Sequence, residues 1–395
     1  MSELPGRSGE RHGPSPAVYR RRRLAAILIL AALILGVVFV ADAGDSDDPP
    51  PGSLEALTEE EPVRFTVSAS GDLLIHSPLW AQALENGGGS YDFAPFFEEI
   101  RPWVAGADLA LCHLETPLTT GSPASYPVFA TPDELADAVR ASGWDACTTA
   151  SNHSLDGGED GIATTGRELD RRGIAHTGSF TSPRERNRPL ILEVKGVKLG
   201  LVGYTDMTNG IPLPEPWAVN VAPCDDDDRA EAILRDVKLA RDAGAEGVLV
   251  NMHWGDEYST EPNECQVDLA ERLTRSPMVA AVIGQGPHVV QPIRRVSGKF
   301  VVFSEGNLVS NQSALAGLPT ETQDGLIALL DFVADQEGVR VERVRYVPTW
   351  VRLDDYAVLP AAAGSDPAYA DSLRDSRQRT VALAGRGRRI VPVRP

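Results

Sequence analysis

The sequence predicts an α/β fold for most of the chain. Apolar, β-type runs alternate with amphipathic helical patterns between residues 64 and 312, an order typical of α/β domains. A hydrophobic content of 42% in 395 residues is enough for a sizeable core. The sequence contains no G-x-G-x-x-G or P-loop motif and no internal repeat.

The elements are expected in the following order. Strands, several of them continuing into loops, are predicted at 64–76, 107–118, 144–158, 174–178, 189–206, 245–258, 278–292 and 299–312. Helices are predicted at 133–143, 161–173, 228–244 and 265–276. Lys195-Gly196 divides the run 189–206 into a hairpin. The basic stretch 374–395 has two interpretations, a helix and strand that pack back on the domain or a frayed tail.

The first 62 residues lie outside the predicted fold. Residues 1–23 are a basic N-terminus, and an apolar run of 18 residues, 24–41, follows it. This length is at the lower limit for a bilayer span, and the charge asymmetry predicts a cytoplasmic N-terminus with the remainder exported. Ala41-Asp42-Ala43 resembles a cleavage site, but the run is long for a signal peptide, so we favour an uncleaved anchor. Residues 42–62 are expected to be an acidic, Pro-rich linker.

Charge and cysteine usage argue against two kinds of site. A formal net charge of −19 argues against nucleic acid as a partner, because phosphate backbones demand a basic face. The four cysteines have no C-x-x-C spacing, which argues against a zinc knuckle. In an exported domain we expect one or two disulfides, with Cys224–Cys265 as the first candidate pair. Cys112 and Cys147 lie in apolar runs and are interpreted as small buried residues.

Residues with metal-binding or proton-carrying groups gather where the apolar runs end. The runs end, in order, at Asp72 and His76, at His113 and Glu115, at Asn152 and His153, at His253, and at His288. Ligands of open α/β sheets bind at the carboxyl ends of the strands. If the runs lie in one sheet system, these groups therefore converge on one cleft.

This set of groups predicts a metal site. Carboxylate, amide oxygen and imidazole are ligands for divalent Mn, Fe, Zn or Mg. A carboxylate such as Asp72 or Glu115 is able to bridge two ions, and a hydroxide held by them would attack a phosphoester at neutral pH. A histidine outside the metal ligands would protonate the leaving group.

Each residue also has a structural interpretation. As alternatives to metal ligands, Asp72 after Gly71 is interpreted as a turn former and Glu115 as a solvated loop residue. For His76 we favour a buried, hydrogen-bonded histidine. For His253 we favour function, because the adjacent Trp254 shields it from water.

Two further acidic residues have alternative roles beside the histidines. Asp156 either caps the helix that follows or holds His153 in one tautomer. Glu257 is either a surface charge or a partner that orients His253.

Six segments together resemble the CapA family of bacterial capsule and poly-γ-glutamate synthesis proteins, which is similar to the calcineurin-like metallophosphoesterases. The segments are SASGDLLIH, LCHLETPLT, SNHSLDGGEDGIATTGRELDRRGIAHTG, VNMHWGDEYSTEPNECQVDLAERL, IGQGPHVVQPI and VVFSEGNLVSNQ. The resemblance assigns 63–350 to a CapA-like domain and leaves 351–395 as a C-terminal extension. It implies a four-layer α/β/β/α sandwich with a metal cleft at the sheet edge, preceded here by the single predicted transmembrane helix.

The resemblance also implies roles for individual residues. The metal positions are matched by Asp72, Glu115, Asn152, His253 and His288. His153 matches the catalytic histidine, with Asp156 beside it. The roles of His76, His113, Glu257, Gln285 and Asn307 stay open.

Two motifs depart from the family pattern. The family usually writes Gly-His-His-Pro-His where this chain has GQGPH, with Gln285 and Gly286 in place of imidazoles. The family usually writes Asn-Leu-Glu where this chain has His113-Leu114-Glu115. Because of these departures, a site with one metal ion and a site without catalytic activity are both alternatives to a two-metal site.

The expected function is that of a membrane-anchored, extracytoplasmic, metal-dependent hydrolase or transferase in the synthesis of an anionic cell-surface polymer resembling poly-γ-glutamate. Membrane-bound polymer synthase subunits are the expected protein partners. The alternative is a non-catalytic scaffold or polymer-binding subunit. Residues 184–188, RERNR, are a candidate basic rim for the polymer, although a solvated loop is the favoured interpretation.

Overall fold

The computed structural model describes residues 61–362 and 364–393. The predicted N-terminal segment 1–23, the predicted anchor 24–41 and nearly all of the predicted linker 42–62 lie outside the described residues. Within the described ranges, no helix has the length and apolar character needed to cross a membrane.

The larger sheet has nine strands, and its centre is parallel. Its strands are β1 (Val63–Leu73), β2 (Leu109–Leu114), β5 (Ala146–Thr148), β6 (Ala175–Thr177), β13 (Asn307–Val309), β14 (Asp324–Asp335), β15 (Gly338–Val351), β16 (Val358–Pro360) and β17 (Ile390–Pro392). The order is β16-β15-β14-β1-β2-β5-β6, with β13 also beside β1 and β17 beside β15. β1, β2, β5 and β6 run parallel, so their carboxyl ends meet at one edge.

The smaller sheet has six strands and also a parallel centre. Its strands are β7 (Leu190–Val194), β8 (Val197–Thr205), β9 (Gly247–His253), β10 (Val279–Gln285), β11 (Ile293–Val296) and β12 (Lys299–Val302), in the order β11-β12-β10-β9-β8-β7. The predicted hairpin at Lys195-Gly196 is confirmed. Both turn residues have positive φ, 49° and 83°, as a tight two-residue hairpin turn requires.

The helices predicted from periodicity are confirmed to within a few residues. The helices are α2 (Ser77–Asn86), α3 (Arg101–Val104), α4 (Leu135–Ser142), α5 (Gly158–Arg171), α6 (Pro183–Arg186), α7 (Arg229–Asp242), α8 (Glu264–Arg275) and α9 (Ala370–Ala384). A short pair, β3 (Leu118–Thr119) and β4 (Thr131–Pro132), lies apart from both sheets. α8 begins with a capping box, in which Asn263 accepts from the Gln266 N–H and Gln266 accepts from the Asn263 N–H.

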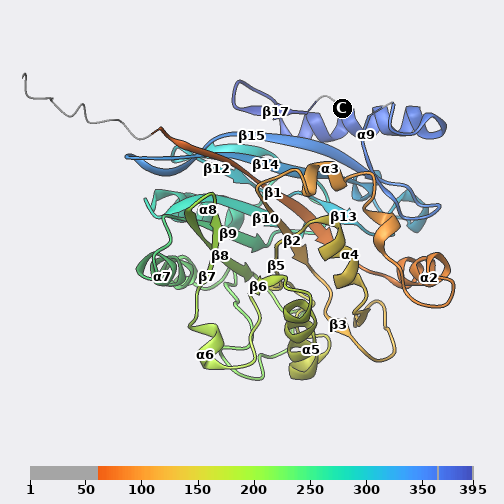
Figure 1. Cartoon of the computed structure of the whole chain (residues 1–395), viewed down its shortest axis with the longest axis horizontal. Helices are drawn as coiled ribbons and strands as arrows, with labels where there is room; N and C mark the ends of the chain where they lie inside the picture. Colours follow the sequence, from red (N-terminus) through yellow and green to blue (C-terminus); the bar gives the residue numbers. More distant parts are fainter. Residues whose placement is uncertain (1–60, 363, 394–395) are drawn as a thin grey trace, which may run out of the picture. The chain divides into compact units, whose positions relative to one another are not determined.

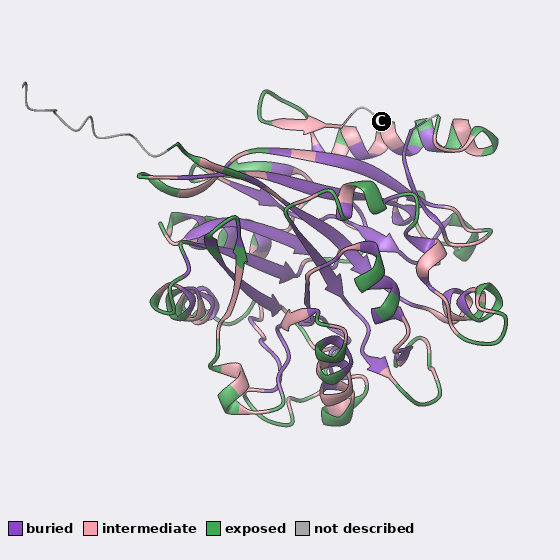
Figure 2. Cartoon of the chain, in the orientation of Figure 1, coloured by how far each residue is buried: buried purple, intermediate pink, exposed green. Residues whose placement is uncertain are grey.

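The two sheets pack face to face, and helices cover their outer faces (Figure 1). Side-chain alternation along the strands produces these layers. In β2, Leu109 and Leu111 face the core shared by the sheets, whereas Ala110 and Cys112 face the core beneath α4. α7 and α8 cover the smaller sheet in the same way. The central strands of both sheets are therefore buried on two sides, as Figure 2 shows, and the predicted α/β fold is confirmed.

The C-terminal segment joins the larger sheet. α9 packs against β14 and β15, and β17 pairs with β15 in parallel. Arg379 on α9 donates two hydrogen bonds to the buried Asp324 on β14, at 2.7 and 2.9 Å. Of the two interpretations of 374–395, the packed helix and strand is found as far as Val393.

Two disulfides cross-link the described residues. The predicted pair Cys224–Cys265 is confirmed, with a Cα–Cα distance of 5.8 Å. Cys112 and Cys147 are buried, as expected, but they are not simply small buried residues, because they form a second disulfide. These two residues are direct neighbours in the β2–β5 ladder, 4.5 Å apart at Cα, a register that composition alone does not reveal.

Candidate metal centre

Strand ends from both sheets meet at the candidate site. In the larger sheet, Asp72 at the end of β1 lies opposite His113 on β2 and Asn307 on β13. In the smaller sheet, His253 at the end of β9 lies opposite Gln285 on β10. The runs thus belong to two sheets, whose carboxyl ends converge.

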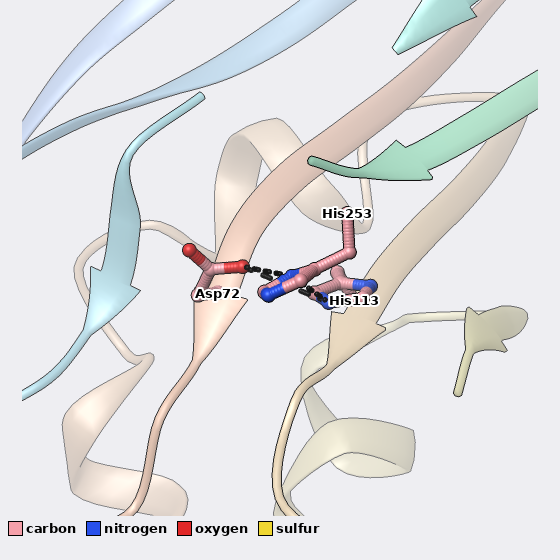
Figure 3. A group of neighbouring side chains, drawn as sticks. All are labelled: Asp72, His113 and His253. Carbon is pink, nitrogen blue, oxygen red and sulfur yellow. Dashed lines mark hydrogen bonds and ion pairs between the residues drawn. The ribbon is translucent and has the colours of Figure 1, made fainter. Parts of the chain in front are cut away.

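A first group of three side chains surrounds one oxygen of Asp72 (Figure 3). Oδ1 of Asp72 lies 3.7 Å from Nε2 of His113 and 3.7 Å from Nδ1 of His253. These two nitrogens are 3.0 Å apart, and the rings stack. All three side chains are buried, so three potential ligand atoms face one point away from water.

A second group surrounds the other oxygen of Asp72. Nδ1 of His288 lies 3.4 Å from Oδ2 of Asp72, and Nε2 of His288 lies 3.9 Å from Oε1 of Glu115. The Gly286 N–H also points toward Oδ2, at 3.4 Å. Asp72 is therefore shared by two groups, which is the geometry expected of a bridging carboxylate.

Hydrogen bonds around His113 fix which nitrogen faces the group. The Thr148 hydroxyl donates to Oδ1 of Asn251 at 2.8 Å and lies 2.9 Å from Nδ1 of His113. Because its one proton goes to Asn251, the hydroxyl accepts from the Nδ1–H of His113. The lone pair on Nε2 is then free to bind a cation beside His253.

His288 is fixed by the same kind of reasoning. The Asn307 amide nitrogen donates to Gln312 and to the Thr322 carbonyl, each at 3.0 Å, so its oxygen is the acceptor for Nδ1 of His288 at 3.1 Å. Nε2 is consequently the nitrogen that faces Glu115, and it would bind a cation in the neutral form of the imidazole. His288 also has a positive φ of 59°, a backbone conformation that costs about 1 kcal/mol and is typical of functional positions.

The site contains buried oxygens without hydrogen-bond partners. They are Oδ1 of Asp72, both carboxylate oxygens of Glu115, and Oδ1 of Asn152. Among the described residues, no lysine or arginine forms an ion pair with Asp72 or Glu115. A buried carboxylate without a cation is costly, so the oxygens fit a site for positive charge.

The pKa shifts agree with this demand for positive charge. Burial would raise the pKa of Asp72, but the neighbouring imidazoles of His253 and His288 outweigh it and hold that pKa below its usual value. Burial would lower the pKa of His288, but Glu115 and Asp72 raise it to about 9. Burial and the charge of Asp72 raise the pKa of Glu115. Burial lowers the pKa of His113 to about 3, which leaves that imidazole neutral.

His153 lies beside this centre with a fixed orientation. Oδ2 of Asp156 lies 2.7 Å from Nδ1 of His153 and also accepts from the Phe129 N–H at 2.7 Å. The Phe129 ring packs edge-on against the imidazole. The backbone N–H of His153 donates to the Ser151 hydroxyl at 3.1 Å, and that hydroxyl donates to the Glu115 carbonyl at 2.6 Å, which places His153 beside Glu115. Asp156 therefore fixes the tautomer of His153. It does not cap α5, because no side chain caps the N-terminus of that helix.

The other sequence candidates lie around the centre with different contacts. Asn152 donates to Asn209 at 3.3 Å and keeps its oxygen free. His76 precedes α2 against Phe129, and its Nδ1 is buried without a partner, which differs from the hydrogen-bonded histidine we favoured. Burial lowers the pKa of His76 to about 4.

Glu257 and Gln285 contact neither of the two groups by hydrogen bonds within the described ranges. Glu257 is exposed, and no hydrogen bond joins it to His253 there. Gln285 donates to Oε2 of the buried Glu305 at 2.8 Å. At Gly286, which follows with φ of 109°, an added Cβ would come within 3.0 Å of the Trp254 backbone. In the GQGPH motif, Gln285 and Gly286 therefore stand where the family has imidazoles. Gln285 is hydrogen-bonded to Glu305, and a side chain at position 286 would press against the Trp254 backbone.

A cavity of about 230 Å³ opens beside the first group. It is lined by Asn152, Asp206, Met207, His253, Trp254, Gly255, Asp256, Glu257 and Gly286. Oδ2 of Asp206 accepts from the Gly255 N–H at 2.9 Å, and burial raises the pKa of that carboxyl. The cavity gives a small molecular group access to the centre from an acidic side.

Sequence reasoning missed several contributors. His113 was left open but is a full member of the first group. Thr148, Asn251 and Asp206 were not singled out, although each ends a predicted strand or adjoins one of the histidine motifs. Their place near the ends of predicted strands is the only feature of the sequence that would have identified these three residues.

Comparisons with known proteins agree with the motifs. The family model described as bacterial capsule synthesis protein PGA_cap matches residues 66–312. The capsule biosynthesis protein CapA of Bacillus anthracis is 22% identical over 74% of this chain and 69% of its own length. The PGA biosynthesis protein CapA of Bacillus subtilis is 28% identical, over 42% of each chain. A probable polyglutamine synthesis accessory protein of Mycobacterium tuberculosis is 27% identical over 53% of this chain and 57% of its own length.

Solved structures give weaker likenesses. The calcineurin-like phosphoesterase YfkN of Bacillus subtilis matches with a TM-score of 0.44 and 15% identity, over 81% of this chain and 98% of that one. A phosphatase from Mycoplasma pneumoniae matches with a TM-score of 0.43 and 13% identity, over 73% of this chain and 94% of that one.

The family match rests on the segments that build the centre. It spans more than half of the chain and includes every residue of both groups, from Asp72 to His288. The chain therefore belongs to the bacterial capsule synthesis protein family PGA_cap.

Proposed function

We propose that this protein is a metal-dependent phosphoester hydrolase of the calcineurin-like type that acts in the synthesis of an anionic capsule polymer. The observation that carries the proposal is the sharing of Asp72 between two groups of buried histidines and carboxylates, with carboxylate oxygens that have no hydrogen-bond partner among the described residues. The relatives named for capsule and polyglutamate synthesis support the polymer context.

The residues fit two divalent ions. His113, His253 and Oδ1 of Asp72 would hold the first, and Glu115, His288 and Oδ2 of Asp72 the second. Asn152 is proposed as a further oxygen ligand, because its amide oxygen is buried and free. Imidazole ligands favour Mn, Fe or Zn over Mg. Bound ions would supply Lewis acidity and lower the pKa of water to near neutrality.

His153 is proposed as the general acid. Its Nδ1–H donates to Asp156, so Asp156 stabilises the imidazolium and leaves Nε2 as the position that exchanges a proton. Transfer of a proton from Nε2 of His153 to the leaving oxygen would let a phosphoester bond break without an alkoxide leaving group. Phe129 limits rotation of the ring and keeps Nε2 in one direction.

The function is tested by metal analysis combined with a phosphodiesterase assay. The full-length protein is loaded with Mn or Zn and assayed on bis-p-nitrophenyl phosphate. We expect His153→Asn to lower kcat by about 100-fold or more, the usual contribution of a general acid, while both metal ions stay bound. His176→Asn is the matched control, because His176 lies on β6 and pairs with Asp170 on α5. Absence of metal binding at micromolar concentration, or equal activity of both variants, contradicts the proposal.

A membrane-anchored, extracytoplasmic location is proposed with this function. Residues 24–41 would be the anchor, 42–62 the linker, and membrane-bound polymer synthase subunits the partners. The two disulfides support export, because such bonds persist in oxidising compartments. A C-terminal alkaline phosphatase fusion should be active in cells and sediment with membranes. An inactive fusion, or one released after cleavage behind Ala43, would contradict the anchored location.

A second candidate function is a non-catalytic, polymer-binding scaffold. The specific observation in its favour is Gln285, which donates to Glu305 instead of facing the metal groups. If the metal-loaded protein binds polymer but cleaves no phosphodiester, and His153→Asn has no effect on polymer production in cells, this second function replaces the first.

A further inference from the structure

A second and larger cleft lies at the opposite ends of the same strands. It has a volume of about 890 Å³ and is lined by residues from the starts of β1 and β10, from β14 and β15, and from the β11–β12 turn. Arg64 in this cleft and Asp72 in the metal centre are both on β1, eight residues apart. A strand of that length spans about 26 Å, so the cleft and the metal centre are separate sites. Figure 1 shows β1 as one long strand of the larger sheet.

The cleft is basic although the chain is acidic. Seven lysine and arginine side chains line it, against four carboxylates, whereas the whole chain has a net charge of −19. Four of the cations pair with carboxylates in or near the cleft: Arg64 with Glu342, Lys195 with Asp108, Arg340 with Asp335 and Arg343 with Asp331. Within the described ranges, Arg295, Lys299 and Arg389 form no ion pair.

The three unpaired cations occupy suitable positions. Arg295 lies over the Phe300 ring, 5.4 Å from its centroid, and donates to the Gly298 carbonyl, which fixes its guanidinium. Lys299 is half-buried and donates to the Ser276 carbonyl, and burial lowers its pKa. Arg389 is exposed at the end of the segment that leads into β17. A bound anion would compensate the burial of Lys299 and accept from both guanidinium groups.

The lining of the cleft is also partly apolar. Phe65, Ala280 and Val341 belong to the buried core between the two sheets and also line the cleft. Apolar floor and cationic rim together suit a chain that alternates methylene groups with carboxylates.

The cavity beside the metal centre has the opposite charge. Asp206, Asp256 and Glu257 line it, and no lysine or arginine does among the residues described. A polyanion would be repelled there unless bound ions neutralised the wall. The segment 184–188 does not neutralise this wall, because Arg186 is paired with Asp236 at 2.8 Å and neither Arg184 nor Arg188 lines the cavity.

We propose that the basic cleft binds a stretch of polycarboxylate chain, at a distance from the metal centre. The proposal rests on the proposed polymer function and adds to it a second site with a stated ligand class. An anionic membrane surface is the less suitable ligand, because the cations lie in a concave cleft interspersed with carboxylates. A flat array of headgroups would meet those carboxylates directly, whereas a single chain can pass between them.

The test compares two triple variants with equal loss of charge. In the first, Arg295, Lys299 and Arg389 are each changed to Gln. In the control, the exposed cations Arg101, Arg235 and Lys238, which lie outside the cleft, are changed to Gln. Binding of fluorescein-labelled poly-L-glutamate to the full-length protein in nonionic detergent is followed by anisotropy. We expect the cleft variant to lose about tenfold or more in affinity and the control to stay within about twofold.

Other readouts separate this proposal from the proposed function. Circular dichroism and bound-metal content should be unchanged in the cleft variant, so a loss of polymer binding is not a loss of fold or of metal. Asp72→Asn should retain polymer binding. Equal affinities of the two triple variants overturn the proposal. So does displacement of the polymer by millimolar inorganic phosphate, or preferential binding to phosphatidylglycerol-doped micelles that the cleft variant abolishes.

Discussion

Buried carboxylates occur in two different settings in this protein. Asp324 on β14 is 1% exposed and receives two hydrogen bonds from the Arg379 guanidinium. Asp72 on β1 is fully buried, has only imidazoles and a backbone N–H near it, and keeps Oδ1 without a hydrogen bond. Both carboxylates lie in the larger sheet, so the difference is in their partners.

The difference separates a folding role from a binding role. A guanidinium satisfies a buried carboxylate permanently and ties α9 to the sheet. At the metal centre, neighbouring imidazoles hold the pKa of Asp72 below its usual value, but burial and Asp72 raise the pKa of Glu115, so the charge of Glu115 stays unfavourable until a cation binds. A buried acid that lacks a lysine or arginine therefore marks the site where the fold gives up stability for binding.

The largest effect is expected when Asp72 loses its charge. Asp72→Asn keeps the shape but removes the anionic ligand shared by both groups. We expect metal affinity to fall by about 1000-fold, or ~4 kcal/mol, because neither ion keeps its bridging carboxylate. Calorimetric titration of the metal-free protein with Mn or Zn measures this. A loss of less than tenfold in metal affinity would mean that Asp72 has a folding role, like Asp324, and not a binding role.

The second prediction concerns the paired acid. Arg379→Leu leaves Asp324 buried without its cation and should lower the free energy of unfolding by about 3 kcal/mol. Metal affinity should not change. Adding Asp324→Asn should recover most of the loss, because the unpaired charge is then gone. Urea unfolding of the three proteins measures the effect, and equal stability of wild type and Arg379→Leu would remove the distinction between the two settings.

The third prediction has the opposite sign. Burial and Asp72 raise the pKa of Glu115, so its charge is unfavourable in the metal-free fold. Glu115→Gln should therefore raise the free energy of unfolding of the metal-free protein by about 1 kcal/mol while it weakens metal binding. Thermal unfolding with EDTA and with saturating metal separates the two effects. A variant that is less stable under both conditions would contradict the assignment of Glu115 to a binding role.

The sequence predicted the centre as far as local pattern allows. Asp72, Glu115, His253 and His288 were predicted because each ends an apolar run, and strand ends share an edge. The full role of His113 was not, because it depends on the register that sets it opposite Asp72, across a shift in the β1–β2 pairing. Register is a tertiary property, and one chain without homologues does not report it.

The fold was predicted with the same limits. Periodicity gave the helices 133–143, 161–173, 228–244 and 265–276 and the hairpin at Lys195-Gly196, since these signals lie within a few residues. It did not assign β14, β15 or the division into two sheets, because those depend on pairing between distant segments, such as Val63 with Ala334. The Cys112–Cys147 disulfide was missed for the same reason.

The smallest effect is expected at a paired acid near the surface. Asp331 receives hydrogen bonds from Arg343 and Arg345, at 2.8 and 2.6 Å. Burial would raise the pKa of Asp331, but these two guanidinium groups lower it below its ordinary value of 3.8. A carboxyl with a lowered pKa contributes stability above pH 3.8, and the contribution is lost as the pH falls through the folded-state value.

Asp331→Asn should therefore cost about 1 kcal/mol at pH 7, where the native carboxylate is charged and paired. As the pH falls below the ordinary value of 3.8, the difference between the two proteins should shrink toward zero, because wild type gains the proton that the variant never needed. Chemical unfolding between pH 7 and pH 2.5 measures the difference, with the exposed Asp225→Asn as a control at an acid that forms no ion pair within the described ranges. A difference that stays constant over this range would mean that packing alone, and not the charge pairing, gives Asp331 its effect on stability. An arginine partner would then not identify a buried acid that contributes to folding.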